Sequence, residues 1–272
     1  MADATVAVLA DVHGNTVALR AVLAELDGLG VRELVVAGDV VGFGPEPDSV
    51  VDLLRERGAR MVRGNHEKDY VAPYATAAMP DWWATSPRLA SMRWSMDRLG
   101  PERRAFLAAL PDRLQLDDET AVMHGSPRHV RDAVLPWTSE AELEAMFEGD
   151  PCRLAFMGHT HRPVVRDLPR RRLVNVGSVG LPLDGDPRAC CVLATPSDVG
   201  WRIETRRVAY DVEATIAAYD QELHAFDPGY VEIMARELRT GRDYFGHWLR
   251  FSKGLPDAEL DAARRRYLDE YP

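Results

Sequence analysis

The first 64 residues alternate between short apolar runs and segments with helical spacing. The apolar runs cover residues 5–10, 33–38 and 60–64, and the helical segments cover residues 15–30 and 47–58. Asn15 is placed to cap the first helical segment, and Asp48 or Ser49 the second. Runs that are apolar throughout are typical of strands buried on both faces, as in parallel sheets covered by helices. The sequence therefore predicts an α/β fold that begins with parallel strands.

The remainder of the chain predicts a helical insertion, more strands and a helical tail. Residues 70–112 are rich in Ala, Met and Trp and favour helices that interrupt the strands. Closely spaced apolar runs then predict strands, in part antiparallel, at residues 120–125, 153–158, 163–168, 171–177, 189–195 and 201–210. We therefore expect one domain over residues 1–210, with an insertion at about 70–112, and a helical extension over residues 211–272. The extension carries no cluster of ligand-type residues and is interpreted as a structural or assembly appendage.

Metal-ligand residue types follow five of the predicted strands. In chain order they are Asp11 and His13, Asp39, Asn65 with His66, His124, and His159 with His161. These loops hold five of the eight histidines in the chain. The carboxyl ends of strands are where open α/β sheets bind ligands. The recurrence of the same residue types at successive strand ends predicts a metal site.

The donor types narrow the choice of metal. Imidazole, carboxylate and amide donors without thiolates favour Mn²⁺, Fe or Zn²⁺ in a reactive site over a structural zinc site. The two oxygens of Asp39 can hold two cations at once. In an extended backbone, alternation sends Asp11 and His13 to the same side, and likewise the two histidines of "GHTH". Glycines precede Asp39, Asn65 and His159 and allow close backbone approach.

The ordered motifs D-x-H, G-D, G-N-H-E, H and G-H-x-H resemble the calcineurin-like metallophosphoesterase superfamily. The strings "DVHGN", "GDVVGFGPEP", "GNHE" and "NVGSVG…DGDPRA" resemble its small bacterial and archaeal phosphodiesterase branch. The resemblance covers roughly residues 4–195 and departs from the pattern at Val176, where a proline is expected. It implies a four-layer α/β/β/α sandwich.

The resemblance also implies a binuclear centre with two divalent ions, Mn favoured and Fe or Zn possible. One ion is assigned to Asp11, His13, Asp39 and His161. The second is assigned to Asp39, Asn65, His124 and His159, so that Asp39 bridges the two. His66 is not a ligand in this scheme. It faces the substrate and protonates the leaving oxygen.

The implied activity is hydrolysis of phosphoester bonds, with small phosphodiesters favoured. A hydroxide held between the two ions would attack phosphorus in line with the leaving oxygen. A phosphomonoesterase or a nuclease of the same superfamily is an alternative, as is a catalytically silent scaffold similar to the retromer subunit. The filled ligand positions and the presence of His66 argue against the scaffold.

Composition limits the partners. The net charge of −10 argues against stable binding of a polynucleotide, whereas a small phosphoester substrate is compatible because bound cations supply positive charge. No apolar run is long enough to span a membrane, and no secretory signal is evident. The three cysteines form no disulfide framework, so we expect a cytoplasmic protein.

Four further residues carry open interpretations. Glu67 either orients a ligand or lies on the surface, and Arg128 either contacts a phosphate or lies on the surface. Asn15 is favoured as a helix cap over a substrate ligand. Ser126 is favoured as a turn residue over a nucleophile, because no G-x-S-x-G elbow surrounds it.

Overall fold

Two five-stranded sheets form the centre of the computed structural model, which describes residues 5–198, 200–225 and 227–271. The first sheet has the order β10 (Gly200–Val208), β9 (Ala189–Ser197), β1 (Val6–Leu9), β2 (Glu33–Val36) and β3 (Arg60–Met61). The second has the order β4 (Arg113–Gln115), β5 (Thr120–Met123), β6 (Leu154–Met157), β8 (Arg172–Asn175) and β7 (Val164–Asp167).

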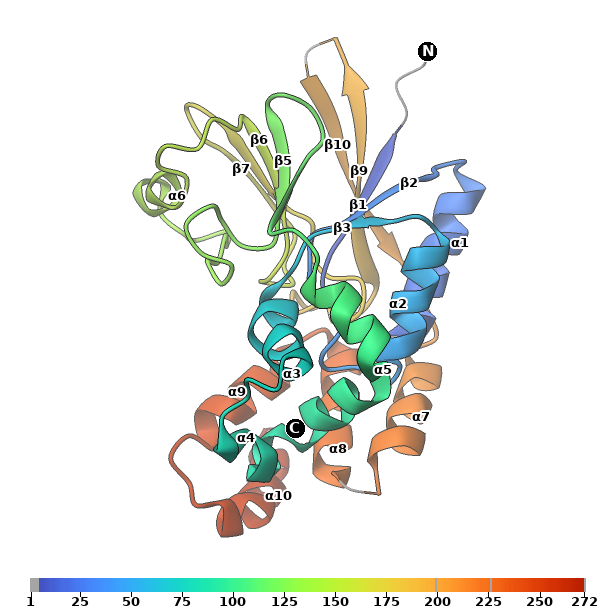
Figure 1. Ribbon diagram of the computed structural model, residues 1–272, viewed down its shortest axis with the longest axis vertical. Coiled ribbons are helices and arrows are strands. Elements are labelled where there is room, and N and C mark those ends of the chain that lie inside the picture. The colour runs from blue at the N-terminus through green and yellow to red at the C-terminus, as the bar shows by residue number, and fades with distance from the viewer. Residues whose placement is uncertain (1–4, 199, 226, 272) are drawn as a thin grey trace.

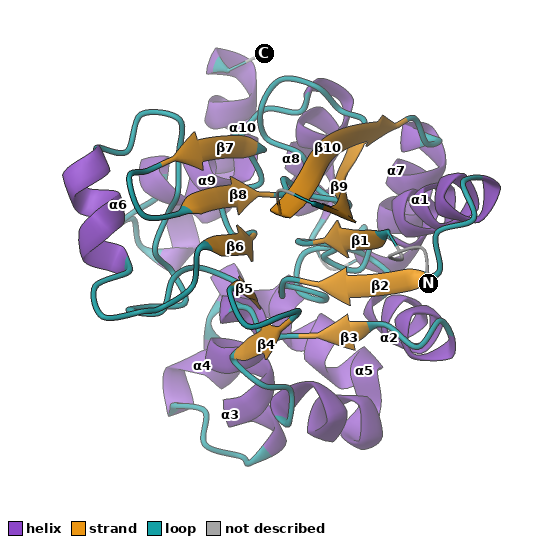
Figure 2. Ribbon diagram, turned by 90° about the horizontal axis from the view of Figure 1, so that it is seen from above, coloured by secondary structure: helices purple, strands orange, loops and turns teal. Residues whose placement is uncertain are grey.

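Helices cover the outer faces of both sheets. Viewed from above, the sheets lie next to each other, with α1 (Thr16–Gly28) and α2 (Pro47–Glu56) outside the first and α6 (Glu140–Met146) outside the second (Figure 2). The layers are therefore helix, sheet, sheet, helix. This confirms the α/β/β/α sandwich that the resemblance implied.

The layers explain why the strands are apolar throughout. In β1, Val6 and Val8 pack into the core between the sheets, whereas Ala7 and Leu9 pack into the core beneath the helices. All four side chains are buried. Successive side chains of a strand point to opposite faces, so a strand in the middle of four layers needs apolar residues at every position.

The strands after the insertion pair in both directions, as the sequence predicts. The pairs β4–β5, β7–β8 and β9–β10 are antiparallel, whereas β5, β6 and β8 run parallel. The long connection that contains α6 allows β5 and β6 to run parallel. The pair β9–β10 leaves the second sheet and extends the first beside β1.

One predicted helix cap is present and one is absent. The Asn15 side chain accepts the Ala18 backbone N–H at 3.0 Å, and its amide donates to the Gly180 carbonyl at 2.9 Å, so Asn15 is a cap. The cap predicted at Asp48 or Ser49 is wrong. Helix α2 begins at Pro47, whose fixed φ suits the first helical position and which needs no N–H bond there.

The insertion and the tail gather at one end of the molecule, below the sheets (Figure 1). The insertion holds a π-helical turn (Glu67–Val71), α3 (Ala72–Ala75), α4 (Asp81–Thr85), a 3-10 turn (Pro87–Leu89) and α5 (Ala90–Ala108). The tail holds α7 (Val212–Leu223), α8 (Pro228–Thr240), α9 (Tyr244–Phe251), a 3-10 turn (Asp257–Glu259) and α10 (Leu260–Glu270). The sequence did not predict α9. Within the described ranges no helix has the length and hydropathy to cross a membrane.

Arg88 joins the insertion to the tail. Its guanidinium donates to the Ser252 hydroxyl at 2.9 Å and to the carbonyls of Ser252 and Leu255 at 3.0 and 2.8 Å. The residues between α9 and α10 are thus held against the insertion by hydrogen bonds that span more than 160 positions of sequence.

Glu237 in α8 makes the stability of this helical end depend on pH. Its buried carboxylate accepts the Phe245 backbone N–H at 2.7 Å, and burial raises its pKa to about 7. The folded protein therefore binds this proton more tightly than the unfolded chain does. The stability that protonated Glu237 contributes to the fold is fully present below the pKa that this carboxyl has in the unfolded chain. It is lost as the pH rises through the pKa of Glu237 in the folded protein.

We expect Glu237→Gln to raise the melting temperature relative to wild type by at least about 3 °C at pH 9, and by little at pH 5. The reason is that glutamine removes the cost of burying a charge. Thermal unfolding at both pH values measures the difference. Glu213→Gln is the control, because Glu213 is exposed and Arg239 lowers its pKa, so its difference is expected to be the same at both pH values. A Glu237→Gln difference that does not grow with pH contradicts the assignment.

Candidate metal centre

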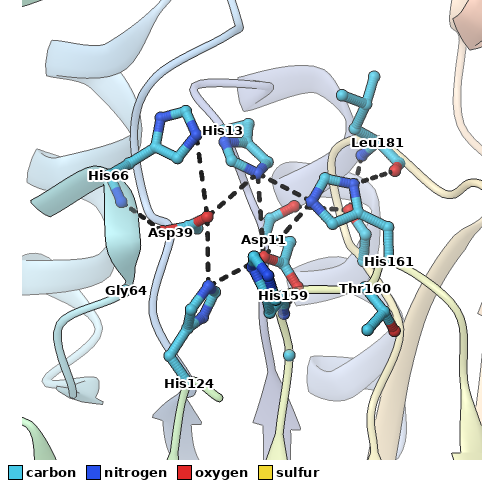
Figure 3. A network of polar contacts seen from close by, with 12 residues as sticks. Asp11, His13, Asp39, Gly64, His66, His124, His159, Thr160, His161 and Leu181 are labelled. Carbon is cyan, nitrogen blue, oxygen red and sulfur yellow. Dashed lines mark hydrogen bonds and ion pairs between the residues drawn. The ribbon is translucent and has the colours of Figure 1, made fainter. Parts of the chain in front are cut away.

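The loops after five strands meet at one edge of the sandwich. Figure 3 shows the side chains of these loops directed toward a common centre. All eight residues predicted from the sequence lie there or in direct contact with it: Asp11, His13, Asp39, Asn65, His66, His124, His159 and His161. Seven of them are buried, and His159 is partly buried.

One group of donors comprises Asp11, His13 and His161. The His161 Nε2 lies 3.1 Å from the His13 Nε2 and 3.5 Å from the Asp11 Oδ1. The His13 Nε2 lies 3.8 Å from the same oxygen. One potential ligand atom from each residue falls within 4.8 Å of the others, a spacing that a single bound cation can satisfy.

A second group comprises Asp39, His124 and His159, which also offer ligand atoms within 4.8 Å of one another. The His124 Nε2 lies 3.3 Å from the Asp39 Oδ2 and 3.1 Å from the Asn65 Oδ1. The rings of His124 and His159 are 5.3 Å apart. Asn65 therefore reaches this group through its side-chain carbonyl.

Asp39 lies between the two groups. Its Oδ2 is 3.7 Å from the His13 Nε2 on one side and 3.3 Å from the His124 Nε2 on the other. Its Oδ1 accepts the His66 backbone N–H at 2.8 Å. A single carboxylate oxygen thus faces both sets of imidazoles.

Backbone carbonyls orient three of the imidazoles. The Nδ1 atoms of His124 and His161 lie 2.7 Å from the carbonyl oxygens of Ala37 and Leu181. A carbonyl can only accept, so each Nδ1 carries a proton and the Nε2 is the ring nitrogen directed at the centre. His13 makes the same contact with the Val41 carbonyl at 3.3 Å. Histidines that bind metals are held in this way by partners on the outer nitrogen.

The residues fit divalent cations. The Asp11 Oδ1 is buried without a hydrogen-bond partner, and the Nε2 atoms of His13 and His161 face each other 3.1 Å apart. A buried carboxylate oxygen without a partner is costly unless a cation satisfies it. The mixed imidazole, carboxylate and amide donors are those that such cations accept.

Burial and neighbouring charges together shift the pKa values of the histidines, in opposite directions for His124 and His159. Burial acts to lower the pKa of His124, but attraction to Asp39 and then Asp11 outweighs it and raises the pKa to about 10. Burial, followed by repulsion from His124, lowers the pKa of His159 to about 4. Burial also lowers the pKa of His66, with Asp39 acting in the opposite direction.

The backbone of the centre is left-handed, not extended as the sequence analysis assumed. Five of the six described non-glycine residues with positive φ are Asp11 (51°), His13 (48°), Asp39 (49°), His159 (71°) and His161 (56°). This conformation costs energy for non-glycine residues, and such strain concentrates at functional sites. Alternation along a strand therefore does not explain the clustering. His159 and His161 turn toward different groups.

The glycines before the ligand-type residues allow close contact. A Cβ on Gly64 would lie 2.0 Å from the Asp39 Oδ1, and one on Gly158 would lie 2.6 Å from the Asp11 Oδ2. Any side chain at either position would displace a carboxylate, so glycine is required at both.

Glu67 orients the Asp39 loop. Its side chain is fully buried and accepts the backbone N–H groups of Asp39 and Val40 at 2.9 Å and of Gly64 at 2.8 Å. Burial, followed by the charge of Asp39, raises its pKa to about 7. Of the two roles left open by the sequence, orientation is the one observed.

Ser126 and Arg128 do not face the centre. Both side chains bind Asp132, and the Arg128 guanidinium contacts it with two nitrogens. Arg131, which the sequence analysis missed, lines a cavity beside Asp39 instead and is held by Asp69 at 2.6 Å. No sequence motif distinguishes Arg131 from Arg128, since both follow His124 in the same loop.

The cavity beside the centre has a volume of about 290 Å³. Besides Asp39, Asn65, His66 and His159, it is lined by residues of the insertion and by Phe245 and Leu249 of α9. The tail is therefore more than the appendage that the sequence suggested, because it supplies one wall of the cavity next to the candidate metal centre.

The centre lies in the part of the chain that matches a known protein family. Residues 5–198 match the calcineurin-like phosphoesterase superfamily domain, and that range holds all eight site residues. The chain belongs to this superfamily. Membership indicates a phosphoesterase enzyme, in a superfamily whose members typically bind divalent metals.

Proteins with similar sequences or structures match most of the length of this calcineurin-like phosphoesterase. The crystal structure of a metallophosphoesterase from Sphaerobacter thermophilus is 28% identical, with a TM-score of 0.70, and covers 88% of this chain and 99% of that chain. A hypothetical protein from Pyrococcus horikoshii shares the fold at 21% identity and a TM-score of 0.72, covering 88% and 98% of the two chains. An uncharacterized protein from Methanocaldococcus jannaschii is 28% identical over 232 residues, which is 78% of this chain and 90% of that protein.

Proposed function

We propose that this protein hydrolyses small phosphodiesters with two divalent cations. The observation that carries the proposal is the position of the Asp39 Oδ2, which faces His13 at 3.7 Å and His124 at 3.3 Å. A carboxylate shared by two sets of imidazoles is suited to bridging two ions.

Each ion has its own set of donors. The first would be held by Asp11, His13, Asp39 and His161, and the second by Asp39, Asn65, His124 and His159. Bound ions would supply a water nucleophile of lowered pKa and positive charge that stabilises the phosphate oxygens as the ester bond breaks. The absence of thiolate donors favours Mn²⁺, with Fe or Zn²⁺ as alternatives.

His66 is proposed as the general acid. Its ring lines the cavity, and its Nε2 lies 3.9 Å from the Asp39 Oδ2. His66 also offers a ligand atom within 4.8 Å of those of His13 and Asp39, but it belongs to neither of the two groups assigned to the ions. A proton on this ring can be passed to the oxygen of a departing alcohol. A phosphodiester anion bound beside the ring favours its protonated form, which offsets the effect of burial.

Size and charge favour a small substrate. The cavity of about 290 Å³ holds one substituent of modest size. The net charge of −10 repels the phosphate backbone of a polynucleotide, so a nuclease is the weaker alternative. Cys152, Cys190 and Cys191 are free thiols, in keeping with the cytoplasmic location proposed here.

Chelation is expected to abolish hydrolysis, and Mn²⁺ is expected to restore it, because in the proposed reaction the nucleophile is a water that the bound ions activate. The assay compares bis-aryl diesters, cyclic nucleotides, monoesters and single-stranded nucleic acid, each before chelation, after chelation and after Mn²⁺ is returned. Full activity in chelated protein contradicts metal dependence. Faster cleavage of monoesters or nucleic acid than of diesters contradicts the proposed substrate class.

A further inference from the structure

The cavity beside the candidate metal centre has an aromatic wall built from three distant parts of the chain. Phe43 lies in the loop after β2, Tyr70 in the insertion and Phe245 in α9. All three are only partly buried and line the cavity. Leu249 of α9 adds an apolar side chain that is 44% exposed. Apolar surface is thus left open to solvent immediately beside the residues of the centre.

The aromatic rings contact one another through His66. The rings of Phe43 and His66 are 4.6 Å apart, and those of His66 and Tyr70 are 5.4 Å apart, both edge to face. On the other side, Phe43 contacts Phe245 edge to face at 5.4 Å. The proposed acid therefore lies within the aromatic wall, at the position where a leaving group would depart.

Further contacts hold the wall in place. Trp83, which is buried, stacks on Tyr70 at 5.5 Å with an angle of 26° between the rings. The Tyr230 hydroxyl donates to the Phe43 carbonyl at 2.7 Å, and its ring contacts Phe245 at 5.3 Å. Glu237 accepts the backbone N–H of Phe245. The open rings are thus supported from behind by buried groups, as in a preformed binding site.

We propose that this wall binds a planar aromatic ring carried by the leaving alcohol of the phosphodiester, which makes Phe43, Tyr70 and Phe245 specificity-determining residues. The inference rests on the proposed function, because the phosphate must bind at the metal centre for its ester group to reach the wall. Aromatic rings favour edge-to-face and offset contacts with other rings beyond the area that they bury. A cavity of about 290 Å³ accommodates one ring system beside the phosphate, which is the size of an aryl ester or a single nucleoside.

Binding of phosphinates, which have no ester bond to hydrolyse, tests this inference. Calorimetry on the Mn²⁺-loaded protein compares three methylphosphinic acids whose second substituent is 2-phenylethyl, 2-cyclohexylethyl or ethyl, so that a methylene group replaces the oxygen of the leaving alcohol. We expect the phenylethyl compound to bind about tenfold more tightly than the other two. Phe245→Leu, which keeps an apolar side chain but removes the ring, is expected to lose most of this preference. Phe251→Ala is the matched control, because Phe251 lies on the same helix and packs away from the cavity against Tyr267.

The outcomes separate the inference from the proposed function. Equal binding of the phenylethyl and cyclohexylethyl compounds to wild type, or an unchanged preference in Phe245→Leu, overturns the aromatic site even if phosphodiesters are hydrolysed. A preference for the phenylethyl compound that Phe245→Leu loses supports the site even if hydrolysis is not detected. The methylphosphinate of thymidine, with a methylene group in place of the 5′ oxygen, distinguishes the source of the ring: tighter binding than the phenylethyl compound identifies a nucleoside, and weaker binding an aryl group.

Discussion

Asp39→Asn is expected to lower metal occupancy at both proposed positions and to reduce hydrolysis by at least about 100-fold. The substitution keeps the shape of the side chain but removes the negative charge between His13 and His124. A neutral amide oxygen in the position of Oδ2 is also a weaker bridge between two cations than a charged carboxylate oxygen. Elemental analysis of protein loaded with excess Mn²⁺ and then desalted measures the occupancy.

His161→Ala provides the comparison for Asp39→Asn. His161 belongs to the group with Asp11 and His13, and not to the group with His124. Its loss is therefore expected to empty mainly the first metal position. Two tightly bound ions in Asp39→Asn would count against the bridge. Equal metal loss in both variants would show that the two positions are not independent, and would likewise contradict a specific bridging role for Asp39.

The sequence predicted the eight residues that meet at the centre because they follow strands whose ends lie at one edge. Continuous apolar runs identify buried strands, and parallel strands bring their carboxyl ends together. The conformation of the loops could not be predicted in this way. Asp11 and His159 adopt positive φ, which their residue types disfavour and which only the surrounding contacts enforce.

The cavity wall could not be predicted from local patterns. Phe43 and Phe245 are separated by about 200 positions and meet only because α8 and α9 fold back over the strand ends. Arg131 differs from Arg128 only in which aspartate it meets, Asp69 or Asp132. Tertiary packing decides which aspartate each arginine contacts. By contrast, a strand end or a glycine turn can be predicted from a few consecutive residues.

His66→Ala is expected to retain both ions and to lose activity in proportion to the basicity of the leaving group. General acid catalysis typically contributes about 10²–10⁴-fold, and it matters only where the departing oxygen needs a proton. A nitrophenolate leaves readily without one, whereas the alkoxide of a nucleoside or a benzyl alcohol does not. The loss is therefore expected to be large for alkyl and nucleoside esters and small for nitrophenyl esters. His224→Ala, at an exposed histidine that pairs with Asp220, is expected to change neither.

A structural role for His66 predicts a different pattern. The His66 ring packs between Phe43 and Tyr70, and its backbone N–H binds Asp39, so removal of the ring could loosen the turn that carries Asn65. That loosening would lower metal occupancy and slow every substrate about equally. Metal content and rates plotted against the pKa of the leaving alcohol distinguish the two roles. A slope steeper than that of wild type with full metal content supports the acid, and an unchanged slope contradicts it, since only a lost proton donor makes the rate depend more strongly on the leaving group.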